Sequence, residues 1–123
     1  TGALNPVAGS PFTTGTQPYS VVVHKAGTAV SVANRGDSTI SGFSVGTRGT
    51  LTALSGSPYT SGSGVTALAT DSSGDYLLAA ANGGSPDLKM YSFDTTTVGK
   101  LNLVTTTATG TDPTGPVAVA ATH

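Results

Sequence analysis

Cysteine, tryptophan and glutamate are absent from this chain of 123 residues, and only five of its residues are basic. Without cysteine the chain can form no disulfide, no thiol nucleophile and no thiolate metal ligand. A net charge of −1, with the basic residues scattered, excludes nucleic acid and anionic membrane surfaces as main partners. No apolar run approaches the roughly 20 residues of a spanning helix, so the sequence predicts no membrane insertion.

Residues that favour helices are scarce, whereas residues that favour strands and turns are abundant. With three Lys, two Arg and no Glu, a solvent-facing helix has almost no i,i+4 ion pairs to support it. The chain instead holds 22 Thr, 14 Ser and 17 Gly, which are typical of short strands and tight turns. We therefore predict an all-β protein.

The few charges and the many hydroxyl side chains favour a secreted or cell-surface protein. The chain begins "TGALNP", without Met and without the pattern of a signal peptide. We therefore expect either that an upstream segment was removed or that the chain was cut from a longer one.

The sequence repeats itself at intervals of about 50 residues. The stretch "GALNPVAGSPFTTG" near the start returns as "GTLTALSGSPYTSG", and the glycine that opens it recurs at Gly2, Gly49 and Gly99. Between these glycines the other pieces recur in the same order, with Gly27 aligned on Gly74, and a third copy begins as "GPVAVAATH". Such a period indicates a repeat architecture.

Each period contains four apolar runs of five to eight residues or slightly more, separated by turn residues. The expected strands are 19–24, 29–34, 40–45 and 51–59 in the first full unit, and 65–70, 76–82, 88–93 and 101–107 in the second. Four antiparallel strands per period are typical of a β-propeller blade. Pro11 and Pro58 fall late in the fourth run, which suits an outer edge strand, and the aromatics after them, Phe12 and Tyr59, are expected to pack between blades.

The predicted fold is therefore a β-propeller segment of four-stranded antiparallel blades. We expect residues 1–16 to form the outer strand (4–12) and crossover of a partial blade. Residues 17–63 and 64–114 then form two complete blades, and 115–123 contribute the inner strand of a further partial blade. A propeller has about 4–8 blades, so the fold is incomplete as a single chain. A β-sandwich would not explain the repeat.

Two explanations of this incompleteness stay open. The chain is a segment of a longer propeller, or several short chains assemble into a ring or filament. When copies meet head to tail, the shared blade receives only its first and fourth strands, which favours the longer propeller. The expected partners are thus the remaining blades of a longer chain or other copies of this one.

The stretches "GALNPVAGSPFTTGTQP", "SVVVHKAGTAVSVAN" and "DSSGDYLLAAAN" resemble the repeats of lactonase-like, YVTN-type bacterial β-propellers. The resemblance covers essentially the whole chain and concerns blade architecture. It implies relatives that include sugar-lactone hydrolases and muconate-cyclising enzymes, together with surface or secreted propellers without a known reaction. No position here matches a catalytic motif of those enzymes, and a shared fold does not confer a reaction.

In a blade, the connections between the second and third strands and the crossovers between blades lie at one end, around the mouth of the channel. A ligand site is expected there, although polar loop residues are most often simply solvated. The candidate ligand-binding residues are Gln17, Arg35, Asp37, Asn82, Asp87 and Asp112. No catalytic residue, metal ligand or cofactor is predicted.

Three further motifs have ordinary interpretations. Arg35-Gly36-Asp37 matches the tripeptide that integrins bind, but Asn, Gly, Asp and Ser also suit a hairpin turn. "DSSGD" at residues 71–75 resembles a calcium loop with the wrong spacing, and a type I turn closed by Gly74 is expected instead. His24 is expected to be an exposed turn residue.

Two functions from different classes follow. The first is a non-enzymatic structural or interaction module, which the low charge and the lack of a catalytic constellation favour. The second is part of a lactonase-like enzyme whose acid and base residues lie outside this chain.

Overall fold

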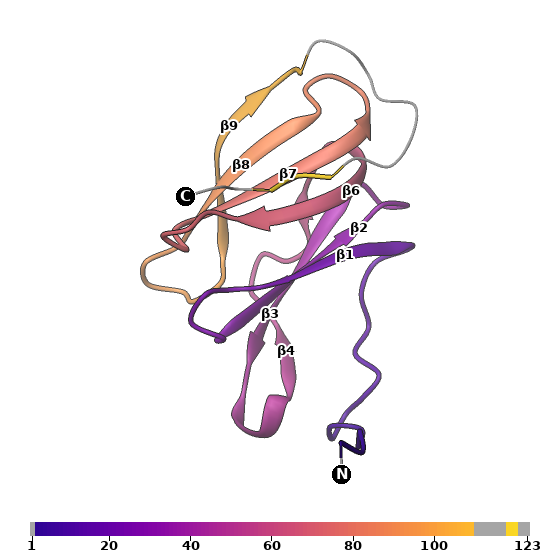
Figure 1. Cartoon of the computed structure of the whole chain (residues 1–123), viewed down its shortest axis with the longest axis vertical. Helices are drawn as coiled ribbons and strands as arrows, with labels where there is room; N and C mark the ends of the chain where they lie inside the picture. Colours follow the sequence, from indigo (N-terminus) through magenta and orange to yellow (C-terminus); the bar gives the residue numbers. More distant parts are fainter. Residues whose placement is uncertain (1, 110–117, 121–123) are drawn as a thin grey trace.

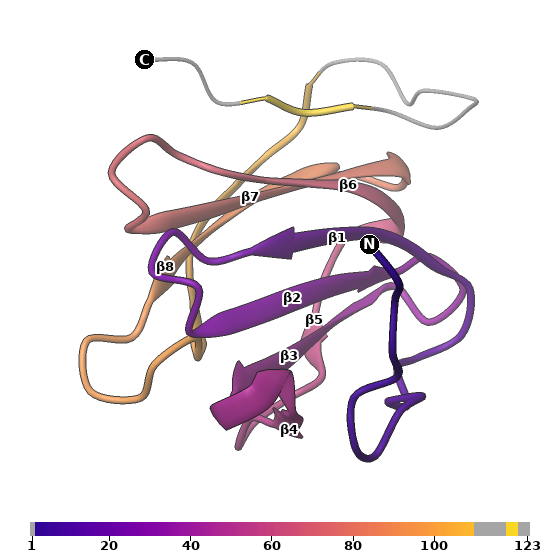
Figure 2. The ribbon, with the colours of Figure 1, turned by 60° about the horizontal axis from the view of Figure 1, so that its bottom comes forward.

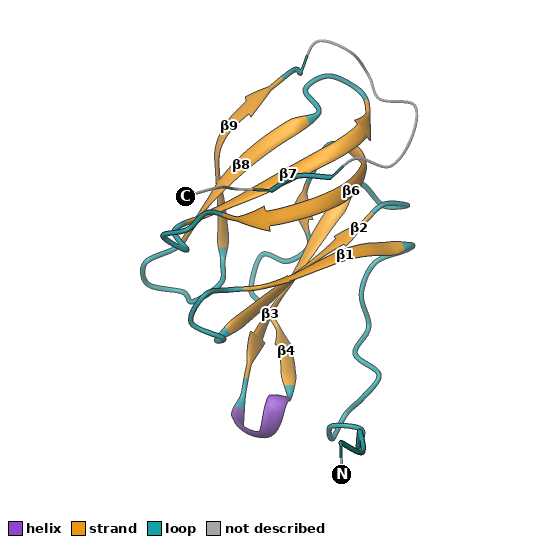
Figure 3. Cartoon of the chain, in the orientation of Figure 1, coloured by secondary structure: helices purple, strands orange, loops and turns teal. Residues whose placement is uncertain are grey.

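The computed structural model describes residues 2–109 and 118–120, and the strands of this part form two antiparallel sheets (Figure 1, Figure 3). The strands of the first sheet, here named blade 1, are β1 (Pro18–Val23), β2 (Ala29–Asn34), β3 (Thr39–Val45), β4 (Leu51–Ala53) and β5 (Tyr59–Thr60). The strands of the second, blade 2, are β6 (Ser63–Thr70), β7 (Tyr76–Gly83), β8 (Leu88–Phe93) and β9 (Leu101–Thr107). The 3-10 turn η1 (Thr47–Gly49) joins β3 to β4.

In both sheets each strand pairs with the next along the chain, except that β5 pairs with β3 and not with β4. The predicted strands over residues 29–34, 88–93 and 101–107 are confirmed at their bounds, and β1, β3, β6 and β7 differ from the predictions by one or two residues at an end. The all-β prediction and the four-stranded antiparallel blade are therefore confirmed. The two sheets do not close into a ring.

The expected outer strand over residues 51–59 is wrong in one respect, because a turn interrupts it. The amide of Ser57 donates to the carbonyl of Leu54 (3.0 Å), and Gly56 has a positive φ of 88°. Gly42 of β3 donates its amide to Ser57 Oγ (2.9 Å) rather than to a strand carbonyl. Pro58 follows without an N–H to donate, so pairing with β3 resumes only at Tyr59.

The expected outer strand over residues 4–12 is absent, although its turn is present. The amide of Ser10 donates to the carbonyl of Val7 (2.9 Å), and Gly9 has a φ of 89°, close to the 88° of Gly56 in the next repeat. The turn is a local structure, whereas β4 and β5 exist because both pair with β3. No strand precedes residues 4–12 in the described part of the chain, so nothing pairs with them. The inner strand expected within 115–123 lies largely outside the described residues.

The core lies between the two sheets, which Figure 2 shows as two layers with β1 close to β6. Ala33 and Ile40 of blade 1 are fully buried against Val65 and Leu77 of blade 2. Tyr59 packs against the same cluster, so the prediction that this aromatic lies between blades is confirmed. Burial of apolar side chains at this joint is what holds the sheets together.

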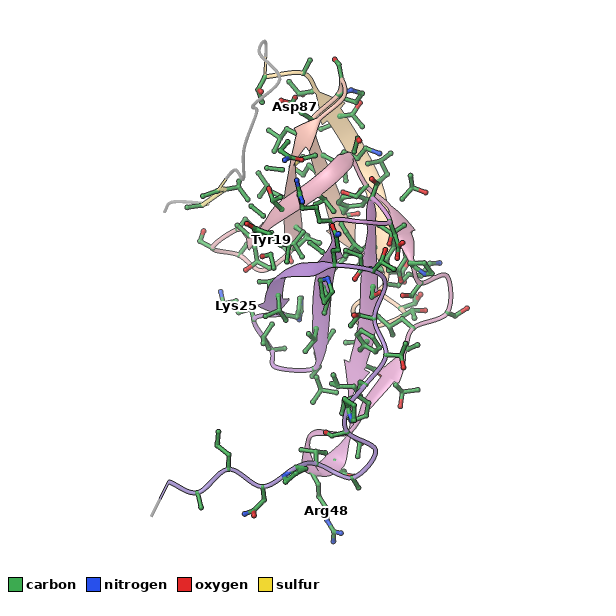
Figure 4. The ribbon with its side chains drawn as sticks, turned by 90° about the vertical axis from the view of Figure 1, so that its right-hand side faces the viewer. Tyr19, Lys25, Arg48 and Asp87 are labelled. Atoms are coloured by element: carbon green, nitrogen blue, oxygen red, sulfur yellow. The ribbon has the colours of Figure 1, made fainter. Side chains whose placement is uncertain are left out.

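The outer face of blade 1 remains open. Val22 of β1 points into the core, whereas Tyr19, Val21 and Val23 alternate with it and are 52%, 65% and 56% exposed. Tyr19 is labelled on β1 in Figure 4. Within residues 2–109 and 118–120 no helix is long and apolar enough to cross a membrane.

Candidate functional site

The predicted site is the end of the blades where crossovers meet the β2–β3 and β7–β8 turns, on the right of Figure 1. The structure brings Gln17, Arg35 and Asp37 together there. Arg35 donates its amide to the carbonyl of Gln17 (2.9 Å), and Gly36 donates its amide to the carbonyl of Thr16 (3.1 Å). The β2–β3 turn is therefore bonded along its backbone to the crossover that enters blade 1.

Asp37 completes this attachment with its side chain. One carboxylate oxygen accepts a hydrogen bond from the amide of Thr16 and the other accepts one from the Thr16 hydroxyl. These two bonds stabilise the charged form and lower the pKa of Asp37 below its ordinary value. Because Thr16 donates to both carboxylate oxygens, the Arg35-Gly36-Asp37 stretch is a turn that is hydrogen-bonded to the crossover.

Asp87 has the same role in blade 2, where it faces the crossover that leaves the blade. It is 4% exposed and lies at the far end of the molecule from Arg48 in Figure 4. Thr109 donates its amide to one carboxylate oxygen (2.8 Å) and its hydroxyl to the other. Both bonds lower the pKa of the Asp87 carboxyl group, and the bond from the Thr109 hydroxyl has a larger effect than the bond from the Thr109 amide.

Three candidate side chains remain available for a ligand. Arg35 is half-buried, and among the described residues its Nε atom is buried without a hydrogen-bond partner. Gln17 is exposed with a φ of 50°, and Asn82 is half-buried beside Gly64. The structure thus places Gln17 with Arg35 at one crossover and Asn82 with Asp87 at the next. Asp112 lies outside the described residues.

The turn at residues 71–75 is the predicted one. Gly74 donates its amide to the carbonyl of Asp71 (3.1 Å) and has a φ of 82°. The Asp71 carboxylate accepts bonds from Ser73, Gly74 and Tyr76. These bonds, that of the Ser73 hydroxyl foremost, lower the pKa of Asp71 to about 2. No group of three potential metal ligands occurs among the residues that the structure describes.

The prediction that His24 is an exposed turn residue is wrong. Its ring is half-buried, stands edge-on to Phe93 with centroids 4.4 Å apart, and donates from Nε2 to the carbonyl of Gly74 (2.9 Å). Beside it, Lys25 Nζ donates to the carbonyl of Ser72 (2.8 Å). The β1–β2 turn of blade 1 is thus bonded across the joint to the β6–β7 turn of blade 2.

An open cavity of about 510 Å³ lies at this end of the joint, opposite the predicted site. We call it the joint cavity, and its lining includes His24, Lys25, Asp75, Phe93, Asp94 and Val98. A single repeat does not predict this cavity, because turns of two different repeats line it. The alignment of Gly27 with Gly74 contained the signal, since equivalent turns of adjacent blades lie side by side.

Comparison with known proteins identifies the class that this geometry defines. A family model described as "Lactonase, 7-bladed beta-propeller" matches residues 3–119. The chain belongs to this lactonase-like family of seven-bladed β-propellers, and the predicted resemblance is confirmed. No curated protein matches the chain.

Two solved structures share the fold. One is a functionally unknown protein from Desulfotomaculum acetoxidans, with 16% identity and a TM-score of 0.64, in which the match covers 75% of this chain and 27% of that one. The other is a protein from Lactobacillus plantarum, with 22% identity, a TM-score of 0.67 and coverage of 90% and 30%. This chain therefore spans less than a third of the length of either.

Proposed function

We propose that this chain is a non-enzymatic structural or interaction part of a β-propeller, secreted or at the cell surface, whose open sheet faces join further blades. The observation that carries the proposal is the open face of β1. Val21, which is 65% exposed, aligns in the repeat with Leu68, which is 9% exposed because blade 1 covers it. The open face of blade 1 is thus equivalent in the repeat to the face of blade 2 that packs against blade 1.

The partners that fit this face are the remaining blades of a longer chain or other copies of this chain. Both present the same chemistry, an apolar sheet face of the kind that lies opposite β6. The share of the solved structures that this chain covers, 27% and 30%, supports the longer chain. Scarce charges and abundant Ser and Thr support the extracellular location, which fractionation of the source cells would test.

The proposal can be tested by comparing the covalent and native masses of the source protein. We expect either a covalent chain well above 12.0 kDa or native multimers of a 12.0 kDa chain. The double variant Val21→Lys/Val23→Lys should abolish multimers of the isolated chain, because burying two unpaired ammonium groups is costly. Thr52→Lys, an exposed position on β4, is the matched control. A 12.0 kDa chain that is monomeric at all concentrations would overturn the proposal.

A second candidate function is part of a lactone-hydrolysing propeller. Membership of the lactonase-like family favours it, and the unpartnered Nε of Arg35 at the crossover end offers a donor for an oxyanion. Hydrolysis of D-glucono-1,5-lactone, followed by pH-stat titration above the buffer rate, distinguishes the two functions. The non-enzymatic proposal expects no acceleration. Acceleration that Arg35→Met removes would support the enzyme instead.

A further inference from the structure

The joint cavity is formed by two blades that are both described, so its walls do not depend on a missing neighbour. The β1–β2 turn of blade 1 forms one side, and the β6–β7 and β8–β9 turns of blade 2 form the other. His24 and Lys25 are held by carbonyls across the joint, as described above. A volume of about 510 Å³ lies within the range of about 300–1,000 Å³ that small-molecule sites occupy.

Several polar groups of the cavity have no internal partner. Among the described residues, no hydrogen bond or ion pair engages the carboxylate of Asp75, and none engages the hydroxyls of Thr28 and Thr95. Asp94 differs, because Thr96, Thr97 and Asn102 donate to its carboxylate and Lys100 Nζ lies 4.0 Å from it. One free carboxylate acceptor and two free hydroxyls, all on exposed residues, therefore line this space.

The charges around the cavity cancel. The lining holds Lys25, Asp75 and Asp94, and Lys100, which lies outside the lining, pairs with Asp94. With Lys100 counted, the site has no excess charge of either sign to select an ion. The remaining wall is apolar, with Phe93 half-buried and Val98 52% exposed. Such a wall excludes water from one side of a ligand, while the polar groups fix its orientation.

We propose that the joint cavity binds an uncharged polyhydroxylated ring, a carbohydrate of about one sugar unit. Asp75 accepts hydrogen bonds from its hydroxyls, Thr28 and Thr95 exchange further ones, and Phe93 with Val98 contacts the apolar face of the ring. The inference goes beyond the proposed function, because the site lies at the turns and not on the open sheet faces. Failure of either one leaves the other standing.

The probes are glucose, galactose, mannose and N-acetylglucosamine as methyl glycosides, tested by saturation-transfer difference NMR on the whole chain. We expect saturation of the ring protons of at least one sugar and binding about tenfold weaker in Asp75→Ala, because a hydrogen bond to a charged acceptor is lost. Val98→Trp should remove binding by filling the cavity. Val104→Trp makes the same change on β9, where Val104 is 49% exposed, and should leave binding intact.

The possible outcomes separate clearly. Saturation that both cavity variants weaken and Val104→Trp preserves supports the site. Equal saturation in all variants, or no saturation by any of the four glycosides, overturns it. Preferential binding of gluconate or glucosamine would also overturn it, because the proposed ligand is uncharged.

Discussion

Gly99 and Gly49 allow the cost of close packing at the joint to be separated from the cost of backbone strain. Both open the same repeated motif, and their φ angles are 82° and 80°. A Cβ at position 49 would meet only Val7 Cγ2, at 3.6 Å. At position 99 it would collide with the Ala29 side chain of blade 1 and lie 3.1 Å from Leu54 Cδ1. Substitution by alanine therefore adds strain at both positions and a collision at one.

The expected magnitudes follow from these contacts. A left-handed conformation costs a residue with a Cβ about 1–2 kcal/mol, and the stiffer unfolded chain of alanine recovers about 0.4–1 kcal/mol. Gly49→Ala should thus lower the free energy of unfolding by about 1 kcal/mol. Ala29 is 2% exposed on a strand and cannot rotate away, so Gly99→Ala adds an overpacking cost of about 1–3 kcal/mol.

The assay is urea unfolding followed by far-UV circular dichroism and by the fluorescence of the four tyrosines, since the chain has no tryptophan. Coincident transitions of the two probes are the condition for comparing free energies. We expect Gly99→Ala to unfold at clearly lower urea than Gly49→Ala. Equal losses would refute the close approach of the β8–β9 turn to β2.

Three further predictions concern the joint and its turns. Leu77→Ala, at a fully buried site, should cost about 2–5 kcal/mol in urea unfolding, and the half-buried neighbour Leu78→Ala should cost less. Tyr91→Phe removes the hydroxyl that donates to the Thr60 carbonyl at 2.6 Å, and should cost about 1 kcal/mol. Folding lowers the pKa of Asp71 from 3.8 to about 2. The ionised carboxylate therefore stabilises the folded state above pH 3.8, and this stabilisation is lost as the pH falls to about 2. Carboxyl NMR titration should show this pKa, and Ser73→Ala should raise it; an unchanged pKa would contradict the assigned cause.

The strands could be predicted because their signals are local. Alternating apolar residues between turn residues are enough to place β8 and β9 at their observed bounds. The interruption between β4 and β5 could not be predicted in the same way. A local turn at Leu54–Ser57 causes it, and the bond that replaces the strand pairing joins the Gly42 amide to the Ser57 hydroxyl across the sheet. The sequence contains this turn as "AGSP" at residues 8–11 and as "SGSP" at residues 55–58, but it does not show which strand each copy would pair with.

The candidate site was only partly predictable for a related reason. The expectation that polar residues gather at the crossover end holds for Gln17, Arg35 and Asp37, which lie together. Composition did not reveal that Asp37 and Asp87 bind threonines 21 and 22 residues away. From the sequence, a carboxylate on a turn is expected to be free to bind a ligand. Whether it is free depends on the crossover that folds against it.

The repeated glycines explain why a single repeat cannot reveal a site at the joint. Gly2, Gly49 and Gly99 share a positive φ, because the backbone of the motif is set within the repeat. Their surroundings differ from open space at Gly2 to close contact at Gly99, because contacts are set by the neighbouring blade. His24 shows the same rule, since its partners Gly74 and Phe93 both belong to blade 2. Chemistry at the joints of a propeller is therefore specified by pairs of adjacent repeats. To find it from sequence, the residues of the β1–β2 turn of one blade have to be considered together with those of the equivalent β6–β7 turn of the next blade.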